Sequence, residues 1–143
     1  MLVAYNPSQV APLLTNSNLE RIYMGRAPEL SVVAQAYGTE VPISWLEIQL
    51  SHLSEYAGAG NHMPPAIIRE LAQVILANFY YLKLSELMLF FSRVMAGHYG
   101  VFYGSVDPIH LTVFMRQFLL QRNDDIDRIE RRRRQQPPPN LPP

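Results

Sequence analysis

The chain has no cysteine, and several other absences in the sequence exclude whole classes of protein. Without cysteine there is no disulfide, no cysteine-ligated zinc and no thiol nucleophile. A chain of this kind fits a reducing cytoplasm, which is the compartment we expect. Charged residues make up only 17% of the 143 residues, whereas hydrophobic residues make up 48%. That balance is typical of one globular domain with a substantial core and not of a disordered chain.

Long uninterrupted hydrophobic runs are also missing. The most apolar window, residues 71–94, is broken by Gln73, Asn78, Lys83, Glu86 and Arg93. A membrane span needs about 20 residues with few or no charges, so this window predicts two buried helices and no membrane association. The first residues have neither a basic start nor an unbroken apolar stretch, and we expect no signal peptide.

The motifs of metal and nucleotide sites are absent as well. The four histidines, His52, His62, His98 and His110, include no pair spaced three or four residues apart, so we expect no metal site and no cofactor. The spacing of Gly97, Gly100 and Gly104 matches neither a phosphate-binding loop nor a dinucleotide fingerprint. These glycines instead favour tight turns between two helices.

Acid–base chemistry has two carboxylate candidates, and each has a structural explanation. Glu86 falls in the first turn of a predicted helix, where the positive end of the helix dipole favours an acid. Asp107 precedes Pro108, a pattern that is typical of a helix N-cap. We therefore predict that the protein is not an enzyme. A site gathering Glu86, Asp107 and His98 around the glycine-containing loop is the less favoured alternative.

The sequence does contain clear signals for the starts and ends of helices. Proline marks the helix starts at Asn6-Pro7, Pro28, Pro42, Pro64-Pro65 and Asp107-Pro108, and Ser17–Glu20 has the form of a capping box. Glycine marks ends near Gly25, Gly38, Gly58 and Gly97. Between these signals the apolar residues recur with a helical period. A short turn is expected at Tyr80–Lys83, and the last helix should end at Gln135-Gln136-Pro137.

These elements predict an all-α fold, an irregular bundle of six to seven helices. The expected core residues are Trp45, Leu71, Ile75, Leu87, Phe91, Phe114 and Phe118. Helical spacing also places Ile48, either Leu46 or Leu53, and Val74 inward. Residues 98–104 alternate glycine with aromatic and β-branched side chains, which favours a small loop or a β-hairpin. We expect a helical domain over residues 1–127 and a flexible, basic and proline-rich tail over residues 128–143.

Charge is distributed unevenly between these two parts. Residues 1–127 carry seven Lys and Arg against eleven Asp and Glu, and residues 128–143 carry five Arg against one Glu. The five cations are Arg128, Arg131, Arg132, Arg133 and Arg134. A basic arm of this kind binds DNA or RNA weakly and without sequence preference. Equally, cations near a helix C-terminus favour the helix dipole, and such a run is often only solvated. The final PPPNLPP could present a polyproline ligand.

Two further segments are candidates for contact with a partner. Tyr99, Phe102 and Tyr103 lie in one short loop, and they could stack on bases, pack on a partner protein or fold back over the helices. Residues 64–79 and 84–96 have the size of a helix-turn-helix unit. Its second helix offers only Ser85, Ser92 and Arg93 for reading DNA, however, so we favour an ordinary core hairpin.

The stretch from Tyr81 to Arg122 resembles an uncharacterised family of small proteins from phages and mobile elements of gut bacteria. The shared pattern comprises L-x-x-S-E-L-x-x-F-F at residues 82–91, G-x-Y-G-x-F-Y-G at residues 97–104 and the Asp107-Pro108 helix start, within residues 64–125. The family supplies no established activity. The architecture is also loosely similar to helical replisome accessory proteins and helicase loaders.

Together these features predict a non-catalytic binding protein. The first hypothesis is a mobile-element accessory protein that contacts DNA through its arginine-rich tail and a partner protein through its body. The alternative is a protein–protein adaptor that binds no nucleic acid.

Overall fold

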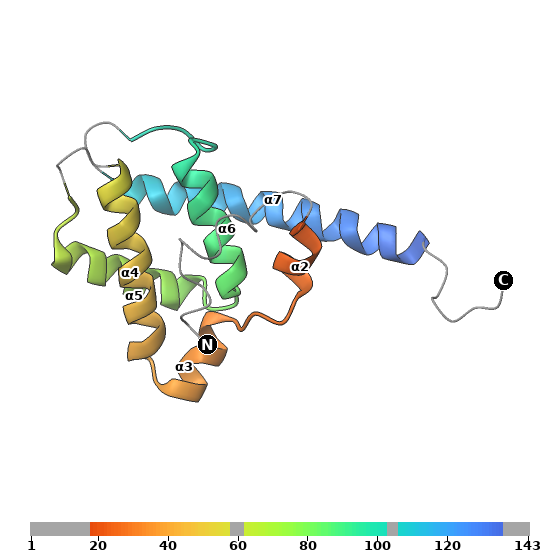
Figure 1. Ribbon diagram of the computed structural model, residues 1–143, viewed down its shortest axis with the longest axis horizontal. Coiled ribbons are helices and arrows are strands. Elements are labelled where there is room, and N and C mark those ends of the chain that lie inside the picture. The colour runs from red at the N-terminus through yellow and green to blue at the C-terminus, as the bar shows by residue number, and fades with distance from the viewer. Residues whose placement is uncertain (1–17, 58–61, 103–105, 136–143) are drawn as a thin grey trace.

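The computed structural model describes residues 18–57, 62–102 and 106–135. This part of the chain contains helices and no strand, which confirms the all-α prediction (Figure 1). The helices are α2 (Leu19–Met24), α3 (Leu30–Tyr37), α4 (Glu40–Ala57), α5 (Pro65–Asn78), α6 (Leu84–Met95) and α7 (Pro108–Gln135). The helix predicted after Asn6-Pro7, Ser17 of the predicted capping box and Tyr103 lie outside the described residues.

Two helix starts differ from the sequence prediction. α3 begins at Leu30 and not at Pro28, because the Pro28 carbonyl accepts a 2.9 Å hydrogen bond from the Leu84 amide. α4 begins at Glu40, two residues before Pro42. The first turn of a helix has amides without helical partners, so the missing N–H of Pro42 costs nothing at the third position.

A short backbone pairing joins the start of α3 to the turn between α5 and α6. Glu29 and Lys83 form an isolated antiparallel bridge. The Leu30 amide donates to the Leu82 carbonyl at 3.0 Å, and the Ser31 amide donates to the Tyr80 carbonyl at 3.0 Å. The turn predicted at Tyr80–Lys83 is therefore confirmed, and it also anchors the N-terminal helices to the rest of the bundle.

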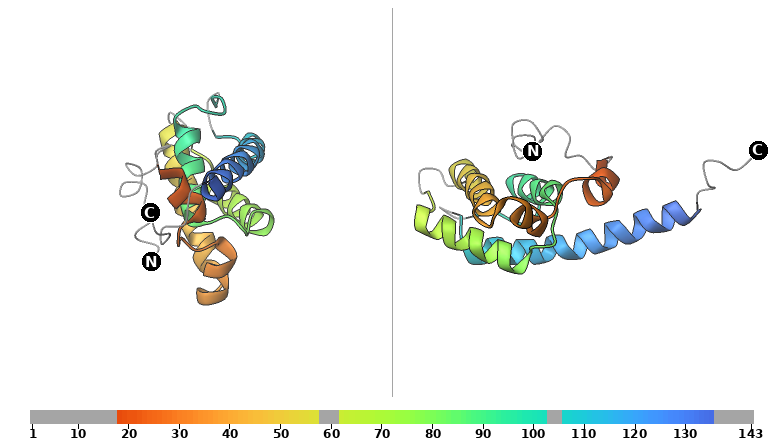
Figure 2. Two further views of the ribbon diagram at one scale, coloured as in Figure 1. Left: turned by 90° about the vertical axis from the view of Figure 1, so that its right-hand side faces the viewer. Right: turned by 90° about the horizontal axis from the view of Figure 1, so that it is seen from below.

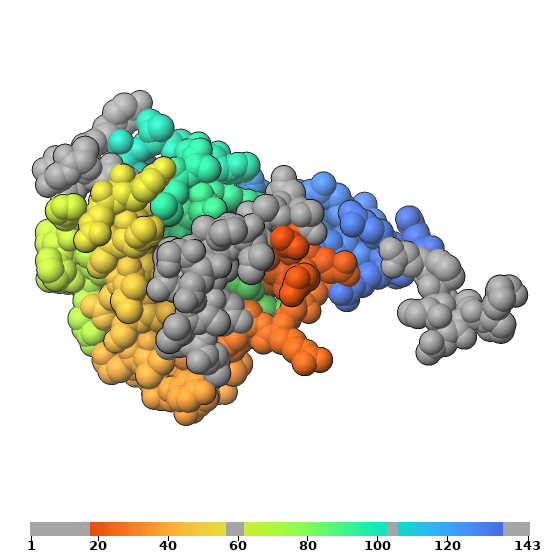
Figure 3. All heavy atoms as spheres, viewed as in Figure 1, coloured from red at the N-terminus to blue at the C-terminus, as the bar shows by residue number. Residues whose placement is uncertain are grey.

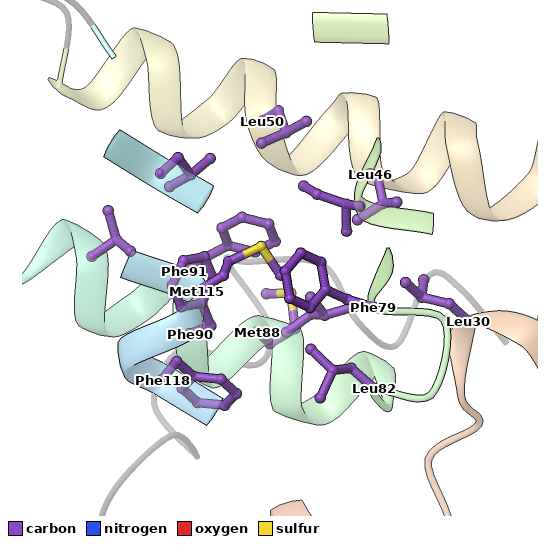
Figure 4. Packing of buried hydrophobic residues seen from close by; sticks show 14 of the residues in the cluster. Leu30, Leu46, Leu50, Phe79, Leu82, Met88, Phe90, Phe91, Met115 and Phe118 are labelled. Carbon is purple, nitrogen blue, oxygen red and sulfur yellow. The ribbon is translucent and has the colours of Figure 1, made fainter. Parts of the chain in front are cut away.

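α6 is the central helix of the bundle, with α2, α4 and α7 all packed against it (Figures 1 and 2). The sequence pattern predicted one inward face, with Leu84, Leu87 and Phe91 among its members. Leu89 and Phe90 are buried as well, because neighbouring helices cover α6 on several sides. Figure 4 shows Phe90, Phe91 and Met88 of α6 meeting Met115 and Phe118 of α7.

The predicted core is largely confirmed, and two inward assignments are wrong. The seven expected core residues are all buried: Trp45, Leu71, Ile75, Leu87, Phe91, Phe114 and Phe118. Ile48 is 62% exposed and Val74 is 44% exposed. On α4 the buried face consists of Trp45, Leu46, Leu50 and Leu53. It includes both of the leucines that the spacing allowed, but not Ile48.

α7 is the longest helix described, and its second half extends past the main body (Figures 2 and 3). Its 28 residues correspond to a length of about 42 Å. α2 packs beside this second half. The helix is described as far as Gln135, and the rest of the predicted end, Gln136-Pro137, lies outside the described residues. Residues 128–135 are therefore helical, while the domain boundary at residue 127 stays a prediction.

The packing of α4 gives a direct test of the core. Replacing Leu46, which is fully buried, by Ala should lower the free energy of unfolding by about 2–5 kcal/mol. Replacing Ile48 by Ala on the same helix should change it by no more than about 0.5 kcal/mol. Urea unfolding followed by circular dichroism measures both. Equal losses in the two variants would show that α4 is oriented differently.

Candidate functional site

The candidate site is the second half of α7, and the start of that helix explains how it is positioned. Asp107 caps α7, because its Oδ1 accepts a 2.8 Å hydrogen bond from the Ile109 amide. That bond lowers the pKa of the Asp107 carboxyl. Leu111, Phe114 and Phe118 then bury one stripe of the helix in the core. The N-cap role predicted for Asp107 is confirmed.

The same stripe becomes polar where α7 leaves the core. Arg122 Nε donates to Glu86 Oε2 of α6 at 2.7 Å, and the Arg122 guanidinium lies 5.8 Å from the centre of the Tyr81 ring. Glu86 is completely buried, and its second carboxylate oxygen has no hydrogen-bond partner. Burial raises the pKa of the Glu86 carboxyl, and Arg122 opposes that shift. The negative charge of the buried Glu86 carboxylate therefore depends on Arg122 for its compensation.

Asp125, one turn further along α7, joins three elements. Tyr23 of α2 donates its hydroxyl hydrogen bond to Asp125 Oδ2 at 2.9 Å, and Arg128 donates to Oδ1 at 2.6 Å. Arg93 of α6 lies 3.9 Å from Asp125. Burial raises the pKa of Tyr23, and the neighbouring Asp125 adds to the rise. The phenol therefore remains a donor, and it links α2 to α7.

The five arginines predicted to contact nucleic acid all lie in the last two turns of α7 and are exposed. Three of them already pair with carboxylates. Arg128 pairs with Asp125 at 2.6 Å, Arg131 with Asp127 at 2.6 Å, and Arg133 with Glu20 of α2 at 2.5 Å. Within the part of the chain that is described, Arg132 and Arg134 have no such pairing.

The loop between α6 and α7 places its aromatic residues against the bundle. The Tyr99 ring is stacked on Phe114 at 5.8 Å, and its hydroxyl donates to Gln121 Oε1 at 2.8 Å. Phe102 packs against Phe114 at 5.4 Å. Both loop side chains are half-buried. Over residues 98–102 the described loop is irregular, so a hairpin there stays a prediction, as does partner binding.

A small cavity lies under this loop. Its volume is about 190 Å³, and its lining includes Tyr56 of α4, Val94 of α6, and Val101 and Phe102 of the loop. The lining is mainly apolar, so the cavity is suited to an apolar side chain more than to a charged ligand. Phe102 therefore borders a hollow that a partner could fill.

The three residues of the alternative enzyme hypothesis have separate partners. Glu86 pairs with Arg122, His98 lies 2.9 Å from the Gln121 amide nitrogen, and Asp107 caps α7. None of them lines the cavity under the loop. Over residues 18–57, 62–102 and 106–135, no group of three or more acidic or histidine residues is arranged to hold a metal ion.

The helix-turn-helix alternative is wrong for α6. A recognition helix must expose one face to the groove, whereas Leu84, Leu89 and Phe90 are buried around α6. Ser85 donates to the Ile22 carbonyl at 2.7 Å, and Arg93 donates to Gln121 at 3.2 Å. Both helices contribute core residues, as we favoured, but α5 packs mainly against α4 and not against α6. None of the described helices is long and apolar enough to span a membrane.

The pairing of Glu86 with Arg122 gives a second test. Replacing Arg122 by Gln leaves a buried carboxylate uncompensated and should cost about 3–5 kcal/mol of stability. Replacing Arg131 by Gln removes the pair with Asp127, which is exposed on both sides, and should cost less than about 1 kcal/mol. Urea unfolding at neutral pH compares them. A loss for Arg122→Gln no larger than for Arg131→Gln would mean that Glu86 does not need its partner.

The raised pKa of Glu86 gives a third test. In the folded protein this carboxyl holds its proton to higher pH than in the unfolded chain, where the pKa is about 4.5. Stability relative to Glu86→Gln should therefore be greatest below pH 4.5 and fall as pH rises through the folded pKa. Unfolding of both proteins from pH 4 to 7 measures this difference. A difference that grows with pH would reverse the assigned direction.

Comparison with known proteins places most of this region in one family. A family model described as a family of unknown function (DUF6633) matches residues 62–143. No curated protein and no solved structure matches the chain. The predicted resemblance to an uncharacterised family is thus confirmed, while its phage origin and replisome likeness stay predictions.

Proposed function

The chain belongs to DUF6633, a family of unknown function, and we propose that it is a non-catalytic binding protein that contacts DNA through the end of α7. We further propose that it acts in the cytoplasm as an accessory protein of a phage or mobile element, with a partner protein on its body. The sequence resemblance described above supports that setting.

One observation carries the proposal. The last turns of α7 extend past the main body with five exposed arginines, and α2 packs beside this end (Figures 1 and 2). A helix with side chains is about 10–12 Å wide and can lie along a phosphate backbone on the side that α2 leaves open. Exposed guanidinium groups on such an arm form charge-assisted hydrogen bonds to phosphate oxygens.

The ion pairs of the arm set the strength of this binding. Arg132 and Arg134 meet phosphate with no carboxylate to displace, whereas Arg128, Arg131 and Arg133 each have one. With two phosphate contacts, the logarithm of affinity should fall against the logarithm of salt concentration with a slope of about −2. Binding by all five arginines would give a slope of about −4.5. We therefore propose weak binding without sequence preference.

The absence of catalysis is part of the same proposal. Glu86 is held by Arg122 in the core, and Asp107 is used in capping α7. Acid–base catalysis requires groups that reach one substrate together, and these two carboxylates have structural partners on different elements.

Fluorescence anisotropy with labelled duplex DNA tests the proposal. We expect micromolar binding that weakens with salt and is largely lost in the double variant Arg132→Gln/Arg134→Gln. The matched control Arg128→Gln/Arg131→Gln removes the same charge from the preceding turn of the same helix and should lose less affinity, because its arginines are already paired. Equal losses of affinity in the two double variants would mean that only the net charge of the arm matters. No binding by the unaltered chain would show that the protein does not bind duplex DNA.

A protein–protein adaptor is the second candidate. Two observations favour it: carboxylates already neutralise three of the five arginines, and an apolar cavity lies beside Phe102. This candidate predicts no DNA binding by any of the proteins in the anisotropy experiment. It also predicts that the Arg132→Gln/Arg134→Gln variant keeps its protein partner.

A further inference from the structure

One exposed face of α7 carries an unusual series of side chains, which we call the outer stripe. It consists of Ile109, Val113, Arg116, Leu120 and Asp124. These residues are spaced by three or four positions, so they follow one side of the helix. Ile109 is 75% exposed, Val113 is 44% exposed and Leu120 is 69% exposed. Single exposed apolar residues are normal on a protein surface, but three in line on one helix form a potential contact surface.

The outer stripe lies opposite the buried face of the same helix. Leu111, Met115 and Phe118 fill the core, and each is offset by roughly half a turn from a member of the stripe. The exposure of Ile109 and Leu120 therefore follows from the orientation of α7, which the core fixes. No helix of the described part of the chain covers these two side chains.

The charges of the outer stripe are arranged symmetrically about Leu120. Arg116 lies four residues before Leu120, and Asp124 lies four residues after it. Both are exposed, and neither is in an ion pair with the described residues, unlike Arg128 and Arg131 further along. The exposed amides of Gln117 and Asn123 lie three residues to either side of Leu120. Amide and opposite-charge positions thus recur at equal distances from Leu120, whereas Val113 and Ile109 correspond to Asp127 and Arg131 on the other side.

We propose that the outer stripe binds a second copy of this chain, with two α7 helices crossing antiparallel about a twofold axis at Leu120. In such an isologous contact each residue meets the residue at the same distance on the other side of the axis. Leu120 then packs on Leu120 of the second copy. Arg116 pairs with Asp124 of the second copy, and this pairing occurs twice.

Charge complementarity favours a second copy over an unrelated partner. A helix rotated by 180° about Leu120 presents an acid to Arg116 and a base to Asp124, so the centre of the stripe is complementary to itself in charge. The stripe is short compared with a standard interface, which buries about 1,600 Å². The dimer should therefore be weak and depend on concentration.

Sedimentation equilibrium of the full chain, without nucleic acid, tests the dimer. We expect a monomer–dimer equilibrium that Leu120→Asp abolishes. Arg116→Asp alone places two acids opposite each other, and Asp124→Arg alone places two bases opposite each other. Each single variant should dimerise about tenfold or more weakly, because two attractive pairs become repulsive.

Mixing the two single variants provides the decisive control. In a heterodimer of Arg116→Asp with Asp124→Arg, both cross-axis pairs again join opposite charges, so association should return to the level of the unaltered chain. General destabilisation of either variant cannot produce that recovery. A monomer at all concentrations, a dimer unaffected by Leu120→Asp, or no recovery in the mixture would each overturn the proposal. These outcomes do not depend on DNA binding.

Discussion

The rest of the structure depends on the burial of α6. α2, α4 and α7 pack against it, and its Leu84, Leu87 and Phe90 are fully buried. This burial supplies much of the apolar area that stabilises a chain of this size. It also takes Glu86, on the same helix, out of water, and a buried carboxylate must be compensated. The position of α7 is constrained by that requirement, because Arg122 is the group that supplies the compensation.

The pairing of Glu86 with Arg122 also fixes what the rest of α7 can do. Once Arg122 is held at α6, Asp125 is placed one turn further on, within reach of Tyr23 and Arg93. Lys83 adds a further link, since its Nζ donates to the Tyr23 carbonyl at 2.6 Å and to the Gly25 carbonyl at 3.1 Å. α2 is only six residues long, and a helix of that length has little stability alone. These contacts therefore help to hold it against α6 and α7.

Local signals were sufficient to predict most of the helices but not the contacts between their polar groups. Proline and glycine restrict the backbone only within a few residues of their own position. The start of α5 at Pro65 and the end of α3 before Gly38 could therefore be predicted from the sequence. The rotation of α4 about its axis could not be predicted. Apolar residues lie on two faces of this helix, so more than one stripe of apolar residues fits the helical period. Ile48 fitted one such stripe, and the structure buries Leu50 on another.

The polar site was beyond sequence reasoning for a different reason. Glu86 and Arg122 are 36 residues apart, and Glu20 and Arg133 are 113 residues apart. No spacing rule connects such pairs. The one available signal was a lone acid, Glu86, within the apolar run of α6, which indicates a buried charge in need of a cation but does not say which one. The short-range pairs, such as Asp127 with Arg131 at four residues, have a spacing that places both side chains on one face of a helix.

These ion pairs change how strongly the arginine cluster is expected to bind an anion. Counted in the sequence, five cations in seven residues indicate an anion-binding arm with five free charges. In the folded chain, Asp125, Asp127 and Glu20 each neutralise one of them. The pairs with Asp127 and Glu20 are exposed and contribute only about 0–1 kcal/mol each, so a phosphate can displace these two carboxylates at little cost. Asp125 is buried and keeps Arg128 paired more firmly. The end of α7 is therefore better suited to a weak, reversible contact with an anionic partner than to tight binding, and specificity has to come from another surface of the protein.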